Sequence, residues 1–452
     1  MYNSYALLVD LYELTMAQCY FHYREDTWAT FDLFVRDFPK NRSYLVAAGL
    51  DDILKYVLNL RFVDAELAYL KSLKLFTPDF LGYLKDFRFK GHLWALPEGE
   101  VFFPQETVIR VTAPIIQTQL IESVLLNTVN LQSMIASKAS RIVLSAKSSN
   151  VYDFSLRRTH GPEAGLKVAR SSYLAGFSGT SNVLAGKMYK IPVAGTMAHS
   201  FVMSFRHELD SFLAYAETFP KKTILLVDTY DTLKGIENAV TVGLFLKEKG
   251  HRLVGIRLDS GDFVSLSKIA RHKLNQAGLG DVKIYASGDL DEFKIKVLLS
   301  KGACIDSFGV GTNMGASTDA PVLDVVYKLS EVTDEFGKFQ PKMKISKGKA
   351  TYPGRKQVYR IKDKRGRFVK DIIGLWDEAI KGKPLLKKVI HGGNLVYKAP
   401  ALEQSRIYLK QNLKYFPVAM KEIDSDYRYP VLFSPGLEKL KKDLSKQLVR
   451  RQ

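Results

Sequence analysis

The feature that most constrains this chain is a regular alternation of strand-like and helix-like segments between residues 150 and 320. Short apolar runs there predict strands, and the stretches between them carry apolar residues at helical spacing. The predicted strands are 150–154, 223–228, 253–259, 283–287 and 305–310, and the predicted helices include 232–249, 263–277 and 290–301. Because alternating strands and helices form parallel βαβ units, and continuous apolar runs suit strands covered on both faces, we predict a buried parallel sheet.

Polar residues and glycines follow several of these strands. They are Asp228, Arg257 with Asp259, Ser287, and Gly309 with Gly311. In an α/β barrel the chemistry lies at the carboxyl ends of the strands, and a doubly wound sheet uses the same end. Because polar strand ends recur across the whole region, we favour an irregular, incomplete α/β barrel.

The two ends of the chain follow different patterns. Helices are predicted at 10–21, 43–60 and 64–73, strands at 30–36, 99–104 and 107–112, and a long helical run at 116–145. After residue 320, antiparallel strands are predicted at 322–329 and 357–362, with hairpin turns, and a basic amphipathic helix at 435–452. This change of pattern divides the chain into 1–115, 116–320 and 321–452.

Composition excludes several classes of protein. With 2 cysteines in 452 residues, the chain cannot be a disulfide scaffold or hold a structural zinc site of four cysteines. The start lacks the basic and apolar regions of a signal peptide, and no apolar run is long enough to span a membrane. We therefore expect a cytoplasmic protein without a membrane partner.

The net charge of the chain is +19, from 66 lysines and arginines against 47 acidic residues. Such an excess favours anionic partners, which include nucleic acid, membrane surfaces and phosphorylated small molecules, although it can also serve solubility alone. The basic residues are spread along the chain, with some enrichment after Lys342, and no basic tail with interleaved aromatic residues is present. We therefore do not expect nucleic acid to be the main partner.

Three familiar motifs fail on spacing or residue type. The string Gly179-Thr-Ser-Asn-Val-Leu-Ala-Gly-Lys-Met has its glycines too far apart for a P-loop, and Met188 replaces the required hydroxyl residue. Gly309-Val-Gly-Thr-Asn-Met-Gly misses the dinucleotide-binding spacing by one residue. The string that begins at His207 lacks the second histidine of a zinc protease helix.

The turn Arg257-Leu-Asp-Ser-Gly-Asp places a cation and two carboxylates after one predicted strand. Carboxylates there could hold Mg²⁺ while the backbone approaches a sugar phosphate. A structural alternative is an ordinary turn in which Asp262 caps the next helix. Asp228 ends the preceding strand of the same region, and we favour a functional role for the whole group.

The next two strand ends carry glycines. Gly288, Gly309 and Gly311 would let backbone N–H groups approach a phosphate closely, and the following helix N-termini would favour an anion. A single loop of this kind is more often a simple turn. Two in succession, beside the acidic turn, are typical of a phosphate pocket.

Two further segments contain candidate binding and catalytic groups. In Asp153-Phe-Ser-Leu-Arg-Arg-Thr-His-Gly, Phe154 could stack on a flat ring while Arg157 pairs with its carboxylate; a core aromatic and solvated arginines are the alternative. In Gly195-Thr-Met-Ala-His-Ser, His199 could be a nucleophile toward a phosphoryl group, although a lone histidine is more often structural.

Taken in order, these segments resemble the nicotinate phosphoribosyltransferase family. The resemblance is carried by Asp10-Leu-Tyr-Glu-Leu-Thr-Met, Phe154-Ser-Leu-Arg-Arg-Thr-His-Gly-Pro, Ser178-Gly-Thr-Ser-Asn, Gly195-Thr-Met-Ala-His-Ser, Asp228-Thr-Tyr-Asp-Thr, Arg257-Leu-Asp-Ser-Gly-Asp, Ala286-Ser-Gly-Asp and Phe308-Gly-Val-Gly-Thr. It covers about residues 5 to 330, and more weakly the rest. It implies an irregular α/β barrel beside an α/β sandwich domain built from both ends of the chain.

The resemblance also implies an activity. The family joins nicotinate to 5-phosphoribosyl 1-pyrophosphate to give nicotinate mononucleotide and pyrophosphate in NAD synthesis. It implies coupled ATP hydrolysis, which places the enzyme in the ligase class, with Mg²⁺ and a transient phosphohistidine whose matching position is His199. All of these substrates are anions, as the basic composition favours.

The resemblance assigns further residues to the site. It implies a homodimer in which nicotinate lies between Phe154 and the partner's Tyr12, with Arg157 beside its carboxylate. Thr180 and Ser181 would lie on the same wall. The ribose phosphate and pyrophosphate would meet Arg257, Asp259, Gly288, Gly309 and Gly311, with Asp228 and Asp259 near the metal.

The nearest alternative is a nicotinamide phosphoribosyltransferase. That family carries an acidic residue at the position of Ser181, so the serine here favours a substrate carboxylate beside Arg157. Quinolinate phosphoribosyltransferases share the fold but do not use the phosphorylated histidine that His199 matches. A basic nucleic-acid-binding protein would instead show affinity that falls steeply with salt. A catalytically inactive barrel would require replaced motif residues, and we find none.

Overall fold

The computed structural model describes residues 5–346 and 351–450. The chain forms two compact units, Ile135–Pro321 and a second made of Met1–Met134 with Val322–Gln452. The helix α6 (Glu122–Ala146) passes through the boundary between them. No helix among the described residues is both long and apolar enough to cross a bilayer.

The unit Ile135–Pro321 holds a six-stranded parallel sheet in the order β7-β6-β11-β10-β9-β8. Its strands are β6 (Asn150–Asp153), β7 (Gly179–Thr180), β8 (Ile224–Leu226), β9 (Gly255–Leu258), β10 (Lys283–Ala286) and β11 (Ser307–Val310). Its helices are the 3₁₀ turn η1 (Leu156–Arg158), α7 (Pro162–Leu174), α8 (Val183–Tyr189), α9 (His199–Met203), α10 (Glu208–Thr218), α11 (Thr232–Glu248), α12 (Phe263–Gln276), α13 (Glu292–Ser300) and α14 (Thr312–Gly315). The predicted parallel α/β sheet is confirmed.

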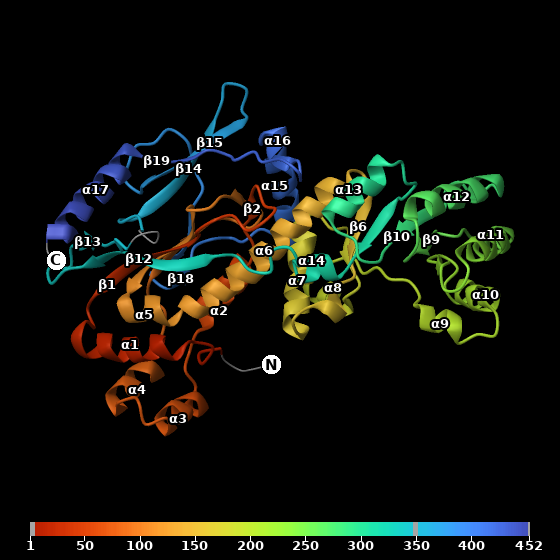
Figure 1. The fold of residues 1–452 in the computed structure, drawn as a ribbon. Coiled ribbons are helices and arrows are strands. Elements are labelled where there is room, and N and C mark those ends of the chain that lie inside the picture. Colours follow the sequence, from red (N-terminus) through yellow and green to blue (C-terminus); the bar gives the residue numbers. More distant parts are fainter. Residues whose placement is uncertain (1–4, 347–350, 451–452) are drawn as a thin grey trace. The chain divides into compact units, whose positions relative to one another are not determined.

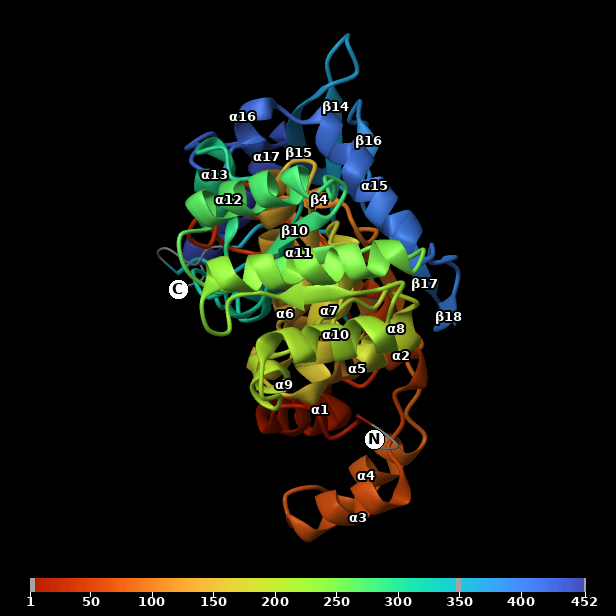
Figure 2. The same ribbon diagram turned by 90° about the vertical axis from the view of Figure 1, so that its right-hand side faces the viewer.

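The sheet is open within the described residues, because its first and last strands do not pair with each other. Strands β7 and β8 are its two edges within the described residues. Figures 1 and 2 both show α12, α11 and α10 stacked in that order beside it. The core between these layers is fully buried and apolar, with Leu225, Ile256 and Ile284 on successive strands. The residues of β9 that pack into this core are buried, whereas Arg257 on the same strand is only partly buried.

The other unit contains mainly antiparallel sheets. Its main sheet has the order β13-β12-β1-β5-β3-β17-β18, a second has the order β16-β14-β15-β19, and β2 pairs with β4. The N-terminal elements are α1 (Leu11–Tyr23), β1 (Trp28–Val35), β2 (Leu45–Val46), α2 (Leu50–Asn59), α3 (Asp64–Ser72), α4 (Pro78–Lys85), β3 (His92–Ala95), β4 (Val101–Phe102), β5 (Thr107–Pro114) and α5 (Ile115–Leu120). The C-terminal elements are β12 (Val325–Thr333), β13 (Phe339–Pro341), β14 (Lys356–Lys362), β15 (Phe368–Leu375), β16 (Lys383–Pro384), β17 (Lys387–His391), β18 (Asn394–Leu395), α15 (Leu402–Tyr415), α16 (Val418–Lys421), β19 (Val431–Phe433) and α17 (Pro435–Arg450).

Pairing between distant segments makes these two ends of the chain one unit. Strand β1 lies antiparallel to both β5 and β12, and in the main sheet the N-terminal strands β1, β5 and β3 lie between C-terminal strands on both sides. The predicted sandwich domain built from both ends is therefore confirmed. Two helix predictions differ from the structure. The single helical run expected at 116–145 is divided at Ile121 into α5 and α6. The helix expected at 43–60 begins only at Leu50. Residues 45–46 form β2 instead, and Leu45 and Val46 are completely buried where β2 pairs with β4.

Two hairpins in this unit are built on the same local chemistry. Asp334 Oδ1 accepts from the backbone N–H groups of Phe336 and Lys338. Asp363 Oδ1 accepts in the same way from Arg365 and Arg367. An aspartate that bonds its own turn, followed by glycine at positive φ, is a strong hairpin signal, which is why the sequence located both turns.

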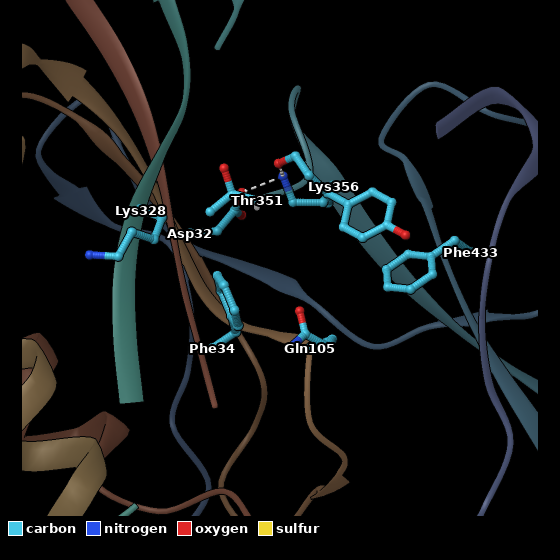
Figure 3. Close-up of a pocket in the computed structure, with 8 residues that line it drawn as sticks. Asp32, Phe34, Gln105, Lys328, Thr351, Lys356 and Phe433 are labelled. Atoms are coloured by element: carbon cyan, nitrogen blue, oxygen red, sulfur yellow. Dashed lines mark hydrogen bonds and ion pairs between the residues drawn. The ribbon is translucent and has the colours of Figure 1, made fainter. Parts of the chain in front are cut away.

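A buried ion pair holds β14 against β1 (Figure 3). Lys356 Nζ lies 2.8 Å from Asp32 Oδ2 and also donates to the carbonyls of Tyr352 and Gly354. Both side chains are almost completely buried, and Asp32 Oδ1 has no hydrogen-bond partner in the part of the chain that the structure describes. Lys328 lies opposite Asp32 in the β1–β12 register, but its side chain extends away in Figure 3.

Removing the cation from this pair should destabilise the protein strongly. In Lys356→Met, Asp32 keeps a buried charge without its counterion, and we expect the free energy of unfolding to fall by about 3–5 kcal/mol. Urea unfolding followed by circular dichroism measures the change. Lys328→Met is the matched control and should cost less than about 1 kcal/mol. An equal fall in the free energy of unfolding in the two variants would mean that Lys356 is not the counterion of Asp32.

Candidate active site

A cavity of about 200 Å³ opens at the carboxyl ends of β6, β9, β10 and β11. It is lined by Phe154, Arg157, Arg158, Arg257, Asp259, Ser287, Gly288, Asp289, Gly309, Gly311 and Thr312. The structure thus brings together most of the residues that the sequence singled out. They come from the last residues of β9 and β11 and from the turns after β6, β9, β10 and β11, and they meet because parallel strands end at one edge of the sheet.

Arg257 organises this edge. Its Nε donates to Ser287 Oγ at 2.8 Å, its Nη2 to Asp259 Oδ1 at 2.9 Å, and its Nη1 to Thr196 Oγ1 at 2.8 Å. The guanidinium therefore joins the ends of β9 and β10 to the loop before α9. Its side chain remains 14% exposed at the cavity, so the cation is positioned and still accessible to an anion.

Asp259 is held as a carboxylate at neutral pH. Burial by itself would raise the pKa of Asp259, but hydrogen bonds from Ser287 and Arg257, together with the charge of Arg257, outweigh burial and lower the pKa. The side chain is 30% exposed, and its Oδ2 is turned away from Arg257 toward His199. A fixed negative charge therefore faces the cavity.

Asp228 ends its strand close to Asp259. Its Oδ2 accepts from the backbone N–H of Asp259 at 3.0 Å and from Ser260 Oγ at 2.6 Å. Its Oδ1 is buried and has no hydrogen-bond partner within the residues that the structure describes. A buried carboxylate oxygen without a donor suits a cation, so Asp228 and Asp259 together fit the oxygen ligands that Mg²⁺ prefers.

His199 is the first residue of α9 and is 41% exposed. Its Nδ1 lies 3.1 Å from Thr229 Oγ1, and its Nε2 lies 3.7 Å from Asp259 Oδ2. It does not line the cavity directly, but it is linked to the cavity through Asp259. The sequence reasoning missed Thr229 and Thr196, because a threonine in a loop carries no signal until its partner is known.

At two positions of the site, neighbouring atoms lie so close to the backbone that only glycine fits. A Cβ on Gly309 would lie 2.4 Å from the ring of Phe154, so the ring packs directly on the backbone of β11. Gly288 has a φ of +97°, and a Cβ there would lie 2.2 Å from the carbonyl oxygen of Asp259. Gly311 has a negative φ and a less crowded Cβ position, so neither geometry requires glycine there.

The turn after β6 places Phe154 and Arg157 on the cavity wall, with Arg157 exposed on η1. Thr180 is completely buried at the end of β7, and Ser181 follows it, half-buried. Neither of these two side chains lines the cavity itself. Asp262, the alternative considered for the acidic turn, caps α12 by accepting from Val264 and Ser265 and does not line the cavity.

A second cavity of about 250 Å³ shares part of this wall. Phe154, Arg257, Ser287 and Gly309 line both cavities. The second one is also lined by the tyrosines at 152 and 285 and the lysines at 221 and 222. The two cavities therefore adjoin along the residues that they share.

Tyr12, the remaining predicted site residue, lies on α1 in the other unit and is half-exposed. Its neighbour Glu13 is completely buried. Burial, followed by the nearby Glu122 and Asp10, raises the pKa of Glu13 to about 7, against an opposing hydrogen bond from Ser123 Oγ at 2.9 Å. Glu13 therefore binds a proton in the folded protein at a pH where it is ionised in the unfolded chain.

The raised pKa of Glu13 predicts a pH-dependent loss of stability. The folded state binds the extra proton between about pH 4.5 and pH 7, so stability falls as the pH rises through that range and then stays level. Glu13→Gln should match the parent at pH 5 and exceed it by about 1–2 kcal/mol at pH 8. Urea unfolding at both values measures this, with the exposed Glu25→Gln as control. A difference that does not change with pH would contradict the prediction.

Three family models match consecutive parts of the chain. Residues 7–130 match the nicotinate phosphoribosyltransferase N-terminal domain, residues 149–361 the nicotinate phosphoribosyltransferase family, and residues 379–441 the C-terminal domain of the same family. Together they cover most of the sequence.

Individual relatives agree with these models. A nicotinate phosphoribosyltransferase of Mycobacterium tuberculosis is 45% identical, over 95% of this chain and 91% of the relative. One of Bacillus subtilis is 40% identical, over 95% and 93%. The crystal structure of human nicotinic acid phosphoribosyltransferase superimposes with a TM-score of 0.85 at 29% identity, over 97% of this chain and 100% of the human one. A nicotinate-nucleotide pyrophosphorylase of Pyrococcus furiosus has a TM-score of 0.72 at 26% identity, over 91% of this chain and 95% of that chain.

Proposed function

The chain belongs to the nicotinate phosphoribosyltransferase family, and from that premise we propose that it transfers the phosphoribosyl group of 5-phosphoribosyl 1-pyrophosphate to nicotinate. The products are nicotinate mononucleotide, a precursor in NAD synthesis, and pyrophosphate. The observation that carries the proposal is the anion-accepting mouth in which Arg257, Asp259 and the glycine turns at 288 and 309 meet.

The residues of this mouth suit the reaction. A bond forms between the nicotinate ring nitrogen and C1 of the ribose while the bond from C1 to the pyrophosphate oxygen breaks. Positive charge develops on the ribosyl centre, and a fixed carboxylate such as Asp259 stabilises it. Arg257 neutralises a phosphate, and the turns at Gly288 and Gly311 bring backbone N–H groups to the same cavity.

The turn after β6 suits nicotinate. Phe154 offers a flat ring that is fixed against Gly309, and Arg157 offers a guanidinium for the carboxylate. Ser181 carries no charge, so it does not repel that carboxylate. These features favour nicotinate over nicotinamide. A homodimer in which the partner's Tyr12 completes the ring site belongs to the same proposal, and the exposure of Tyr12 on α1 is compatible with it.

We assign the coupled hydrolysis of ATP to His199. A ring nitrogen attacks the terminal phosphorus, the bond to the ADP oxygen breaks, and water later cleaves the phosphohistidine to release phosphate. The position of His199 beside Asp259 supports this, because a phosphate on the ring would add negative charge next to the ligands of the metal. Thr229 holds the ring through Nδ1.

Mg²⁺ is part of the same proposal. The unpartnered Oδ1 of Asp228 and the cavity-facing carboxylate of Asp259 are the residues that would hold it. When bound, the ion supplies charge neutralisation for the leaving pyrophosphate. Arg257 and the two carboxylates are held in place by hydrogen bonds before any substrate arrives, so little reorganisation is needed.

The activity is tested directly by measuring nicotinate mononucleotide formed from nicotinate and 5-phosphoribosyl 1-pyrophosphate with Mg²⁺, with and without ATP. We expect turnover that ATP increases, with kcat/KM for nicotinate at least about tenfold above that for nicotinamide, because a lost carboxylate–guanidinium pair costs that much or more. Faster turnover of nicotinamide would favour the alternative substrate. No product from either pyridine would refute the proposed function.

Replacing the proposed nucleophile should uncouple ATP from transfer. In His199→Ala we expect ATP hydrolysis to fall to background and ATP to lose its effect on product formation, because no side chain remains to accept the phosphoryl group. Release of phosphate from ATP and product formation are measured on the same preparation. His272→Ala, an exposed histidine on α12, is the control and should behave as the parent. Unchanged ATP stimulation in His199→Ala would remove His199 from the mechanism.

A further inference from the structure

Asp153 is a buried carboxylate to which the reaction described above gives no part. It is the last residue of β6 and is 1% exposed. No ion pair joins it to a cation within the described residues, although a buried carboxylate without a counterion is costly. All of its charge is instead directed at neutral donors on two different segments. Because burying this carboxylate lowers the stability of the fold, we looked for a role of Asp153 in the site.

We propose that Asp153 is a positioning residue that holds the turn after β6, which lines the cavity, against the end of β7, which packs behind that turn. This inference rests on the proposed function and adds to it a residue that controls how nicotinate is recognised. Asp153 itself does not line the cavity.

The first segment is held through one carboxylate oxygen. Asp153 Oδ1 accepts from the backbone N–H of Ser155 at 2.9 Å and from Ser155 Oγ at 2.5 Å. Ser155 is completely buried, and it packs so closely on Gly315 that a Cβ there would lie 2.4 Å from its own Cβ. The carbonyl of Ser155 accepts from Arg158 at 2.7 Å, so the turn that carries Arg157 starts from this anchored residue.

The second segment is held through the other oxygen. Asp153 Oδ2 accepts from Thr180 Oγ1 at 2.7 Å, and the carbonyl of Asp153 accepts from the N–H of Ser181 at 2.8 Å. Thr180 Oγ1 also accepts from the N–H of Asn182 at 3.0 Å, so the hydroxyl donates to Asp153 and accepts from the backbone at the start of α8. The side chain and main chain of Asp153 therefore both fix β7.

A carboxylate is the one side chain of this size that satisfies both segments. Asparagine has a single acceptor oxygen, and its NH₂ group would face either the N–H of Ser155 or the hydroxyl of Thr180. The backbone N–H of Ser155 cannot accept, so the amide oxygen would stay with Ser155. Thr180 would then have to turn its hydroxyl, and the second segment would loosen first.

We expect a looser contact at Asp153 to weaken the binding of nicotinate more than the binding of 5-phosphoribosyl 1-pyrophosphate. Arg157, Thr180 and Ser181 are the groups assigned to nicotinate, and both segments that carry them are anchored on Asp153. Arg257 and Asp259, the charged groups assigned to the phosphates, are held by hydrogen bonds to each other and to Ser287, and Asp153 contacts none of them directly. The main chain of Thr180 does pair with Pro192 and Ala194, close to Thr196. The structure therefore points to Asp153 as a determinant of nicotinate affinity and not of phosphoribosyl pyrophosphate affinity.

The test is Asp153→Asn, assayed with each substrate varied in turn. We expect KM for nicotinate to rise at least about tenfold, since a misplacement of roughly 1 Å is sufficient for that, while KM for 5-phosphoribosyl 1-pyrophosphate stays within about twofold. ATP hydrolysis measured without nicotinate should stay within about twofold, because His199 does not depend on Asp153. Ser155→Ala, which loses only the hydroxyl bond, should raise KM for nicotinate by a smaller factor and serves if Asp153→Asn does not fold.

The matched control is Ser267→Ala. Ser267 on α12 is equally buried, and its Oγ accepts from the N–H of Cys304 at 3.0 Å, so the variant loses a buried hydrogen bond away from the cavity. We expect both KM values to stay within about twofold of the parent in this variant.

Three outcomes are distinguishable. A selective rise in KM for nicotinate supports the inference. Equal rises in both KM values, or a loss of activity that only follows reduced thermal stability as in Ser267→Ala, would mean that Asp153 is merely structural, and the inference would fall while the proposed function stood. Absence of product from nicotinate with the parent protein would remove the proposed function and this inference together.

Discussion

The candidate site depends on one cation at the ends of two neighbouring strands. Arg257 donates to Asp259, Ser287 and Thr196, and so joins β9, β10 and the loop before α9. Without that guanidinium, the partly buried carboxylate of Asp259 would lose the hydrogen bond and the positive charge that lower its pKa. With it, the edge of the sheet carries a fixed arrangement of opposite charges, which is what a reaction among anions requires.

Two kinds of ion pair can be compared among the described residues. Arg360, which lies 2.6 Å from Asp371 and 2.5 Å from Glu100, is completely enclosed and joins the strands of the sandwich unit. Lys356 and Asp32 are enclosed in the same way. Arg257 differs because one side of it remains open to a cavity. The enclosed pairs and the pair of Arg257 with Asp259 thus use the same chemistry. They differ in whether a ligand can reach the cation.

Local patterns predicted much of this structure, and the errors have physical causes. The parallel strands between 150 and 310, the two aspartate hairpins and the cap at Asp262 all follow from signals that lie within a few residues of each other. The helix expected at 43–60 begins at Leu50, because residues 45–46 are buried by pairing with β4, a segment more than 50 residues away. Thr196, Thr229 and Asp153 were not recognised as part of the site, since each acquires its meaning from a partner elsewhere in the chain.

By itself, the sequence determined the alternation of strands and helices, the polar strand ends and the set of motif residues, because periodicity, turn chemistry and residue type are local properties. Only the tertiary structure decided that Arg257 meets Thr196 and Ser287, that Phe154 packs on Gly309, and that Asp153 joins Ser155 to Thr180. Those contacts depend on which strands become neighbours in the order β7-β6-β11-β10-β9-β8, and that order is set by the burial of whole strands and not by any single segment.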